Sequence, residues 1–137
     1  MQRRIHLYEL CYLFLIGSLI YSLLEIVFRG HTHWTMTLTG GVAGSMLYGI
    51  AADAACPLIL QGAAGAMLIT GTEMVVGVID NMIFGWNVWD YTNMPLNLYG
   101  QICLPFTVLW FFLSIPGILL CRGVRKRFSR FSMDIIS

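Results

Sequence analysis

The sequence predicts an all-α, polytopic membrane protein: a bundle of four transmembrane helices with both termini in the cytoplasm. Three observations lead to this prediction. Of the 137 residues, 58% are hydrophobic and only 11% are charged, whereas a soluble domain carries roughly 25% charged residues. The apolar residues form blocks about as long as the roughly 20 residues that cross a bilayer as a helix. Basic residues flank the first and the last block.

The first two helices are expected over residues 7–28 and 36–52. The first ends at Arg29-Gly30, and a polar loop follows it. The second is shorter and rich in small residues, which repeat at the spacing that lets two helix backbones approach closely in lipid. These residues are Gly40, Gly41, Gly44, Ser45 and Gly49.

The third helix is expected over residues 57–79, with Pro57 in its first turn, where proline is favoured. An aromatic loop, residues 80–97, leads to a fourth helix over residues 98–121, with Pro105 and Pro116 as expected kinks. We therefore expect one transmembrane domain, residues 1–121, and a basic cytoplasmic tail, residues 122–137.

The basic residues predict the orientation of the bundle. Arg3 and Arg4 precede the first helix, and a cluster of five basic residues between Arg122 and Arg130 follows the fourth. Positively charged flanks of membrane helices lie in the cytoplasm. A basic tail is also compatible with nucleic-acid binding, but beside so many apolar residues the membrane-flank interpretation is favoured, and no nucleic-acid partner is expected.

The four cysteines show neither a CxxC pair nor a metal-ligand spacing. Cysteine behaves as a small hydrophobic residue in apolar segments. We therefore expect free thiols at Cys11, Cys56, Cys103 and Cys121.

Polar residues that are costly in a bilayer gather at one end of the expected bundle, the outer end. Ionisable groups inside a membrane usually face the bundle interior or a cavity and are candidates for a functional site. Ser18, Ser22, Glu25 and Arg29 share one face of the first helix by their spacing. The candidate ligand-binding residues are Glu25, Arg29, Glu73, Asp90, Asn97 and Gln101.

These residues allow other interpretations, and Glu9 and the tryptophans are interpreted separately. The carboxylates and Arg29 can instead be structural ion pairs that lock the bundle. His31 and His33 are candidate metal ligands together with Glu25, Glu73 or Asp90, although interfacial hydrogen bonds explain them equally well. Glu9 lies near the cytoplasmic boundary, where it is expected to reach water and has no assigned role. The tryptophans are interpreted as an aromatic belt at the outer interface.

The segment from Trp89 to Leu104 resembles a family of bacterial membrane proteins. Its sequence, WDYTNMPLNLYGQICL, is similar to the pattern W-D-Y-S-x-x-P-x-N-x-x-G-[RQ]-[IV]-x-L of the family named Putative ABC-transporter type IV, or CmpB-like. Glu73, Glu25 and Arg29-Gly30 also fit the family pattern, and the resemblance covers about residues 20–115. Thr92 stands where the family has Ser, and residues 38–41 differ from its Pro-Ile-Tyr-Gly-like motif. The resemblance implies a multi-pass protein of the bacterial cytoplasmic membrane.

Three functional hypotheses follow from these features. The first is a small transporter or channel subunit whose outward-facing polar site binds a small solute or ion. It is expected to form a homo-oligomer, with a dimer favoured, because four helices are few to enclose a pathway. The second is a membrane-embedded enzyme acting on a lipid or its head group, with Glu73 or Asp90 as general base; the third is a structural accessory subunit. No nucleotide-binding motif is present in the sequence, so coupling to ATP would need a separate ATPase, and no cofactor, solute or coupling ion is identified.

Overall fold

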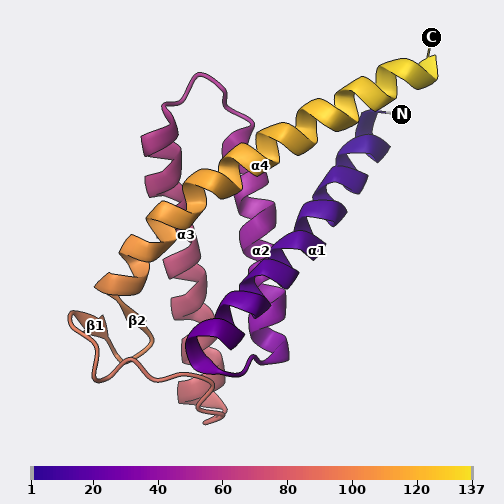
Figure 1. Ribbon diagram of the computed structural model, residues 1–137. Coiled ribbons are helices and arrows are strands. Elements are labelled where there is room, and N and C mark those ends of the chain that lie inside the picture. The colour runs from indigo at the N-terminus through magenta and orange to yellow at the C-terminus, as the bar shows by residue number, and fades with distance from the viewer. Residues whose placement is uncertain (1, 137) are drawn as a thin grey trace.

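The four long helices run alternately up and down, as Figure 1 shows for the computed structural model. The structure describes residues 2–136, with side chains from residue 6 onward. Helix α1 spans Gln2–Arg29, α2 Trp34–Ala51, α3 Leu58–Gly77 and α4 Leu104–Ile136. The backbone of Arg3 and Arg4 belongs to α1, but their side chains lie outside the described ones. The predicted all-α bundle of four helices is confirmed.

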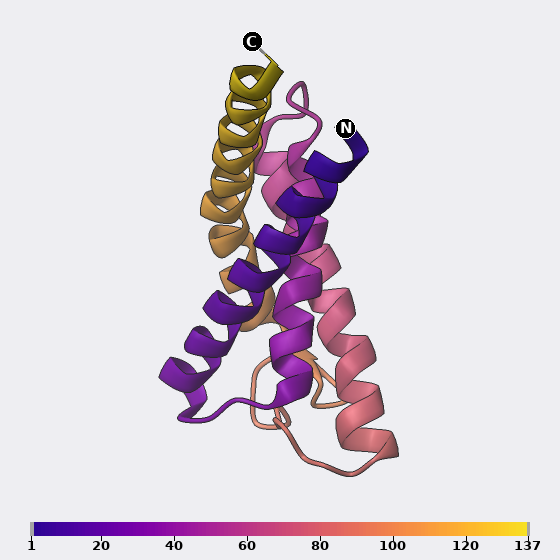
Figure 2. The same cartoon turned by 90° about the vertical axis from the view of Figure 1, so that its right-hand side faces the viewer.

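The two ends of the bundle differ in what they carry. Helix α1 begins and α4 ends at the same end, together with the connection between α2 and α3; we call this the terminal end (Figures 1 and 2). The opposite end, called the loop end, carries residues 30–33 and the long segment 84–103. The even number of helices thus leaves the start of α1 and the end of α4 on one side of the bundle, as the sequence predicts.

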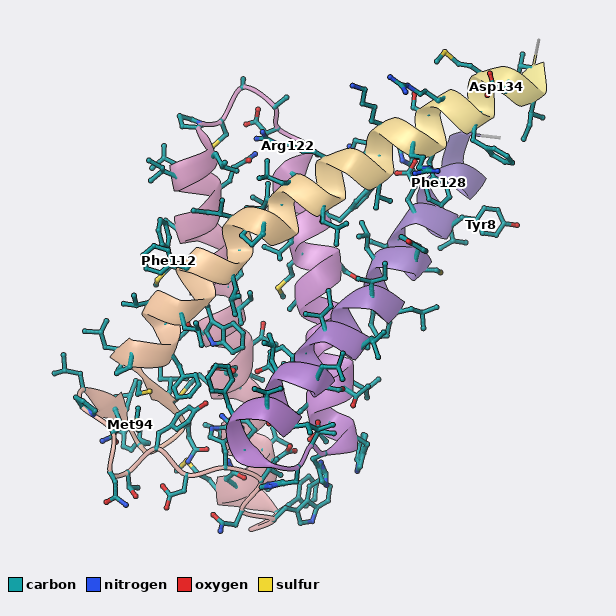
Figure 3. All side chains as sticks on the ribbon, viewed as in Figure 1. Tyr8, Met94, Phe112, Arg122, Phe128 and Asp134 are labelled. Carbon is teal, nitrogen blue, oxygen red and sulfur yellow. The ribbon has the colours of Figure 1, made fainter. Side chains whose placement is uncertain are left out.

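Three of the helical segments are long and apolar enough to cross a membrane. They are His6–Arg29, Leu58–Ile83 and Leu104–Ile136. Large apolar side chains on these helices point away from the bundle, among them Leu15, Val27 and Phe112, which are 69%, 77% and 63% exposed; Figure 3 labels Phe112 on the outer face of α4. Such a surface is suited to lipid rather than water. The protein is a multi-pass membrane protein.

Helix α2 is held against α1 by a seam of glycines. A Cβ atom added to Gly17 of α1 would lie 2.5 Å from the carbonyl oxygen of Gly40, and one added to Gly44 would lie 2.5 Å from the carbonyl oxygen of Leu13. Contacts this short leave no room for any side chain. The predicted close packing is therefore observed at Gly40, Gly41 and Gly44, with α1 as the partner, but not at Gly49, where an added Cβ would meet nothing within 4 Å.

The boundaries of the last two helices differ from those expected. Helix α3 continues beyond Gly77 as a wider π-helical turn, Val78–Ile83. Residues 98–103, expected in the fourth helix, instead form a hairpin between two short antiparallel strands, β1 (Asn97–Leu98) and β2 (Ile102–Cys103). At its tip Tyr99 and Gly100 have φ values of 53° and 70°, the left-handed conformation that a tight hairpin turn needs at both central positions.

Helix α4 is continuous from Leu104 to Ile136 and includes the expected tail. The expected break at residue 122 is therefore absent, because Arg and Lys are good helix formers and no proline follows Pro116. Pro105 is the second residue of α4, where proline is tolerated, so it does not kink the helix interior. At about 1.5 Å per residue, 33 residues make a helix longer than the hydrocarbon core, which is about 30 Å thick.

Candidate functional site at the loop end

The ion pair between Glu25 and Arg29 stands at the loop end of α1. These residues are four apart, so both side chains lie on one face of the helix, and Nη1 of Arg29 donates to Oε2 of Glu25 at 2.9 Å. The side chains are only 7% and 14% exposed, respectively. Nη2 of Arg29 donates to the hydroxyl of Tyr91, which ties α1 to the long segment 84–103.

Aromatic rings surround the guanidinium of Arg29. Its central carbon lies 5.5 Å from the ring centre of Trp89, 5.1 Å from that of Tyr91 and 5.9 Å from that of Phe106. Cation–π attraction at such distances is stronger where water is excluded. Burial, reinforced by the negative charge of Glu73, raises the pKa of Tyr91, so this ring keeps its proton beside Arg29.

A cavity of about 400 Å³ opens at the loop end beside this pair. Charged and aromatic groups share its wall, and the acidic residue in that wall, Asp90, is fully exposed. The backbone N–H of Thr92 donates to Asp90 at 2.9 Å and lowers the pKa of that carboxyl. We call this cavity the mouth. Its wall is formed by Arg29, His31, Asn87, Val88, Trp89, Asp90, Tyr91, Met94 and Phe106.

Glu73 lies deeper in the bundle and is 2% exposed. The hydroxyl of Tyr21 on α1 donates to its Oε1, and Nε1–H of Trp110 on α4 donates to its Oε2 at 3.1 Å. The rings of Tyr21 and Trp110 stack with centres 5.2 Å apart. Both carboxylate oxygens of Glu73 thus have a donor, and three helices meet at this one side chain.

Tyr21, Glu25 and Arg29 form a ladder along α1, one turn apart. The first contacts Glu73 and the last contacts Tyr91. The predicted polar stripe on this helix contains Glu25 and Arg29 of this ladder, but it did not include Tyr21. Tyr21 lies four residues before Glu25, and this spacing could have identified it. Tyr91 lies in the W-D-Y part of the family-like segment, whereas Trp110 gave no signal.

Asp80 is also buried, in the π-helical turn that ends α3. It accepts a hydrogen bond of 2.6 Å from the hydroxyl of Thr35, and Nδ1 of His33 lies 2.7 Å from the same hydroxyl. His33 is the residue that caps the N-terminus of α2. This chain of contacts fixes the start of α2 to the end of α3.

The segment that resembles the family pattern folds back on itself through its polar side chains. Oδ1 of Asn97 accepts from the N–H of Gly100 at 3.1 Å, and its Nδ2 donates to the carbonyl of Met94 at 2.9 Å. A Cβ on Gly100 would lie 2.7 Å from Cγ2 of Thr92. The spacing of Asn97 and Gly100 in the pattern is therefore that of a hairpin whose shape depends on both residues.

Asn97 and Gln101 were expected at the binding site, but neither lines the mouth. Asn97 is occupied by the turn, and Gln101 is buried. The side-chain amide of Gln101 donates to the carbonyl of Tyr99 and accepts from Nδ2 of Asn81, both at 2.8 Å. Its backbone carbonyl accepts from the indole N–H of Trp89 at 2.8 Å. Of the six expected binding residues, Arg29 and Asp90 line the mouth, with Glu25 directly behind Arg29.

The histidines do not converge with a third metal ligand. Nδ1 of His31 lies 3.1 Å from the carbonyl oxygen of its neighbour Arg29, and His33 is used as a helix cap. Within the described residues, no three His, Cys, Asp or Glu side chains gather as a metal site would require. The four cysteines are free, and they lie apart from these histidines in the sequence.

A second polar cluster at the terminal end corrects the expectation for Glu9. This side chain is buried, 2% exposed, and accepts a hydrogen bond from the hydroxyl of Tyr48 on α2. The guanidinium of Arg125 lies over the Tyr48 ring at 4.3 Å and donates to the Tyr48 carbonyl at 3.1 Å. Glu9 does not reach out to water; Tyr48 donates to its carboxylate, and Nδ1 of His6 lies 3.6 Å from its Oε2.

Comparison with known proteins gives one match. The family model described as "Putative ABC-transporter type IV" matches residues 12–136, nearly the whole chain. No curated protein and no solved structure matches.

Proposed function

We propose that this protein is a transporter or channel subunit of the bacterial cytoplasmic membrane, because the chain belongs to the family described as "Putative ABC-transporter type IV". In this proposal its loop end faces outward and takes up a small polar solute or an ion. The observation that carries the proposal is the mouth, in which Arg29 and Asp90 present opposite charges in an aromatic wall. A few charged groups in an otherwise apolar cavity are typical of small-molecule sites.

The proposed orientation has all four helices crossing the membrane. Helix α2 is not among the three segments apolar enough by themselves, but its glycine seam holds it along α1. Its 18 residues reach about 27 Å at 1.5 Å per residue. The basic residues of α4 would then lie in the cytoplasm, where such residues concentrate.

Glu73 has a distinct proposed role below the mouth. Arg29 already compensates Glu25, and Glu73 forms no ion pair within the described side chains. A buried charge without a counter-charge is costly. A cation or a proton that reached Glu73 from the mouth would remove this cost, which is the property that a coupled transporter needs.

The proposed assembly is a homodimer that works with a separate ATPase. Four helices enclose no wide pathway, and the described helices leave much apolar surface uncovered. The terminal end, with its basic extension of α4, is the side on which a cytoplasmic ATPase would bind.

The test is thermal stability of the detergent-purified protein against a panel of ions, metals, amines and lipids. A solute that binds in the mouth should raise the unfolding temperature of the wild type by mass action. Asp90→Asn should lose this effect, because asparagine keeps the turn that Asp90 forms with Thr92 but removes the charge. Asp53→Asn is the matched control, since Asp53 also accepts a backbone hydrogen bond two residues on, at Ala55, and lies at the terminal end.

A second candidate function is that of a structural accessory subunit. It is favoured by the hydrogen bonds that the guanidinium of Arg29 already makes within the protein. Glu25 and Tyr91 already occupy two of its nitrogens, as in a structural ion pair that locks a bundle. If no compound in the panel stabilises the wild type, and Glu73→Gln is only less stable, the accessory role is favoured and the solute site is rejected for that panel. A shift that Asp53→Asn abolishes equally would also contradict a site in the mouth.

A further inference from the structure

A cleft runs between α1 and α4 along the middle of the bundle. The two helices are bridged by aromatic pairs rather than by continuous packing: Tyr12 with Phe128 towards the terminal end, and Tyr21 with Trp110 towards the loop end, with ring centres 6.0 and 5.2 Å apart. Figure 3 shows Phe128 over the first turns of α1. The cleft lies between these two bridges and is distinct from the mouth.

The floor and walls of the cleft are almost wholly apolar. Gly17, Gly44 and Gly117 lie in its lining and add no side chain that would fill it, while Ile20, Leu113 and Leu120 form part of the walls. Ile20 and Leu120 are 46% and 42% exposed, so the cleft is open to the surroundings of the bundle. In a membrane those surroundings are lipid.

The size of the cleft decides between a helix and a single chain as its occupant. Its volume is about 260 Å³. One helical turn, about 5.4 Å long and about 10 Å wide with its side chains, takes up on the order of 400 Å³. This narrow space, lined by glycines, suits part of a single flexible hydrocarbon chain better than a helix from a second copy or a partner, and the rest of the chain would lie in the surrounding bilayer.

The terminal end of the cleft adds a charged group. Cys121 lines the cleft, and Arg125 follows it one turn later on the same face of α4. Nε of Arg125 is buried and has no hydrogen-bond partner among the described residues, although its other end is held by Tyr48. Lys126 and Arg127 follow with exposed side chains. The buried Nε itself is out of reach of a lipid, but Arg125 as a whole is half-buried and stands beside two exposed cations. Basic residues placed in this way attract the phosphate of an anionic lipid.

We propose that the α1–α4 cleft binds one acyl chain of an anionic phospholipid, whose phosphate lies at Arg125. The lipid comes from the leaflet at the terminal end, because the charged group lies at that end of the cleft and the apolar lining continues from it towards the bilayer centre. The site does not depend on the function proposed for the mouth. An acyl chain in the cleft would fill the space between the middle parts of α1 and α4, in the stretch between the two aromatic bridges.

The test is photo-crosslinking in nanodiscs with phosphatidylglycerol that carries a diazirine on one acyl chain. Mass spectrometry of the labelled peptides should find the label on residues that line the cleft, and in particular on Leu120. Leu120→Trp should fill the cleft and reduce this labelling severalfold. Leu119→Trp is the matched control, because Leu119 is the neighbouring exposed leucine, 50% exposed, and does not line the cleft.

The head group is tested separately with phosphatidylcholine that carries the same labelled chain. Arg125→Gln should lower the preference for phosphatidylglycerol by more than the roughly fivefold effect of a basic residue that is merely close to an anionic lipid surface, because it also removes the direct contact with the phosphate. Arg127→Gln removes the same charge from an exposed position and should change the preference for phosphatidylglycerol less. Equal loss in the two variants would overturn the phosphate site at Arg125.

Three other outcomes would overturn the lipid site as a whole. Equal labelling of Leu120 and of outward-facing Phe112 would mean that the label reports only the lipid around the protein. Crosslinks between α1 of one copy and α4 of another, made with cysteines placed at Ile20 and Leu120, would mean that a second copy covers the cleft. Retention of full labelling in Leu120→Trp would contradict the proposed position of the chain.

Discussion

The hydroxyl of Tyr21 on α1 donates to the carboxylate of Glu73 on α3, across 52 positions of sequence. The Tyr21 ring stacks on Trp110, which donates to the other oxygen of the same carboxylate. This arrangement makes Glu73 the point at which α1, α3 and α4 are held together. Tyr21 and Trp110 also line the α1–α4 cleft.

Removal of the Tyr21 hydroxyl should destabilise the bundle. Tyr21→Phe keeps the ring stack with Trp110 but leaves one oxygen of a buried carboxylate without its donor, which costs about 1–3 kcal/mol. The loss should appear as a lower unfolding temperature of the detergent-purified protein, followed by circular dichroism. Tyr12→Phe is the control, since Tyr12 is 46% exposed; equal unfolding temperatures for the two variants would contradict the role of the Tyr21–Glu73 contact.

The glycine seam between α1 and α2 should tolerate no side chain. In Gly44→Ala the new Cβ meets the backbone carbonyl of Leu13 at 2.5 Å, and a backbone atom cannot move aside as a side-chain end can. We expect a large loss of stability or no folded protein.

Gly49→Ala, on the same helix, is the matched control for this seam. A Cβ at Gly49 meets nothing within 4 Å, and alanine is favoured over glycine in a helix by about 1 kcal/mol. This variant should be as stable as the wild type or more stable. Equal unfolding temperatures for Gly44→Ala and Gly49→Ala would show that α2 does not pack on α1 through Gly44.

The Glu25–Arg29 pair should behave as a unit. Arg29→Gln leaves the carboxylate of Glu25 buried without its counter-charge, and breaking a buried pair in this way costs on the order of 3 kcal/mol. The double variant Glu25→Gln/Arg29→Gln should cost less than the sum of the two single variants, because it leaves no uncompensated charge. Thermal unfolding of the four proteins measures this difference, and strictly additive effects would rule out the coupling.

The orientation of the bundle can be tested with the cysteine in the connection between α2 and α3. Cys56 lies at the terminal end and is partly exposed, so a membrane-impermeant maleimide should label it only after the cells are permeabilised. In a variant with Cys56→Ser and Asn87→Cys, the exposed position in the mouth should react in intact cells. The reverse pattern would place the terminal end outside and contradict the positive-inside prediction.

The sequence by itself determined the membrane class, the number of helices and the polar group of Glu25 and Arg29 at the loop end, but not the second polar cluster around Glu9. Hydrophobic blocks, glycine spacing and the family-like segment are local properties, which can be found without knowledge of the fold. The Glu25–Arg29 pair belongs to this group, because two residues four apart on a helix must face the same way. The match of the family model to residues 12–136 agrees with the resemblance found in the sequence.

Only the tertiary structure decided which distant side chains meet. Tyr21 with Glu73, Arg29 with Tyr91 and Glu9 with Tyr48 join segments far apart in the chain, and no local pattern specifies such pairs. The start of α4 at Leu104 was also missed, because residues 98–103 are apolar enough for a helix. Their hairpin is fixed by hydrogen bonds from Asn97 and by close contact of Gly100 with Thr92, which exist only once the segment has folded back on itself.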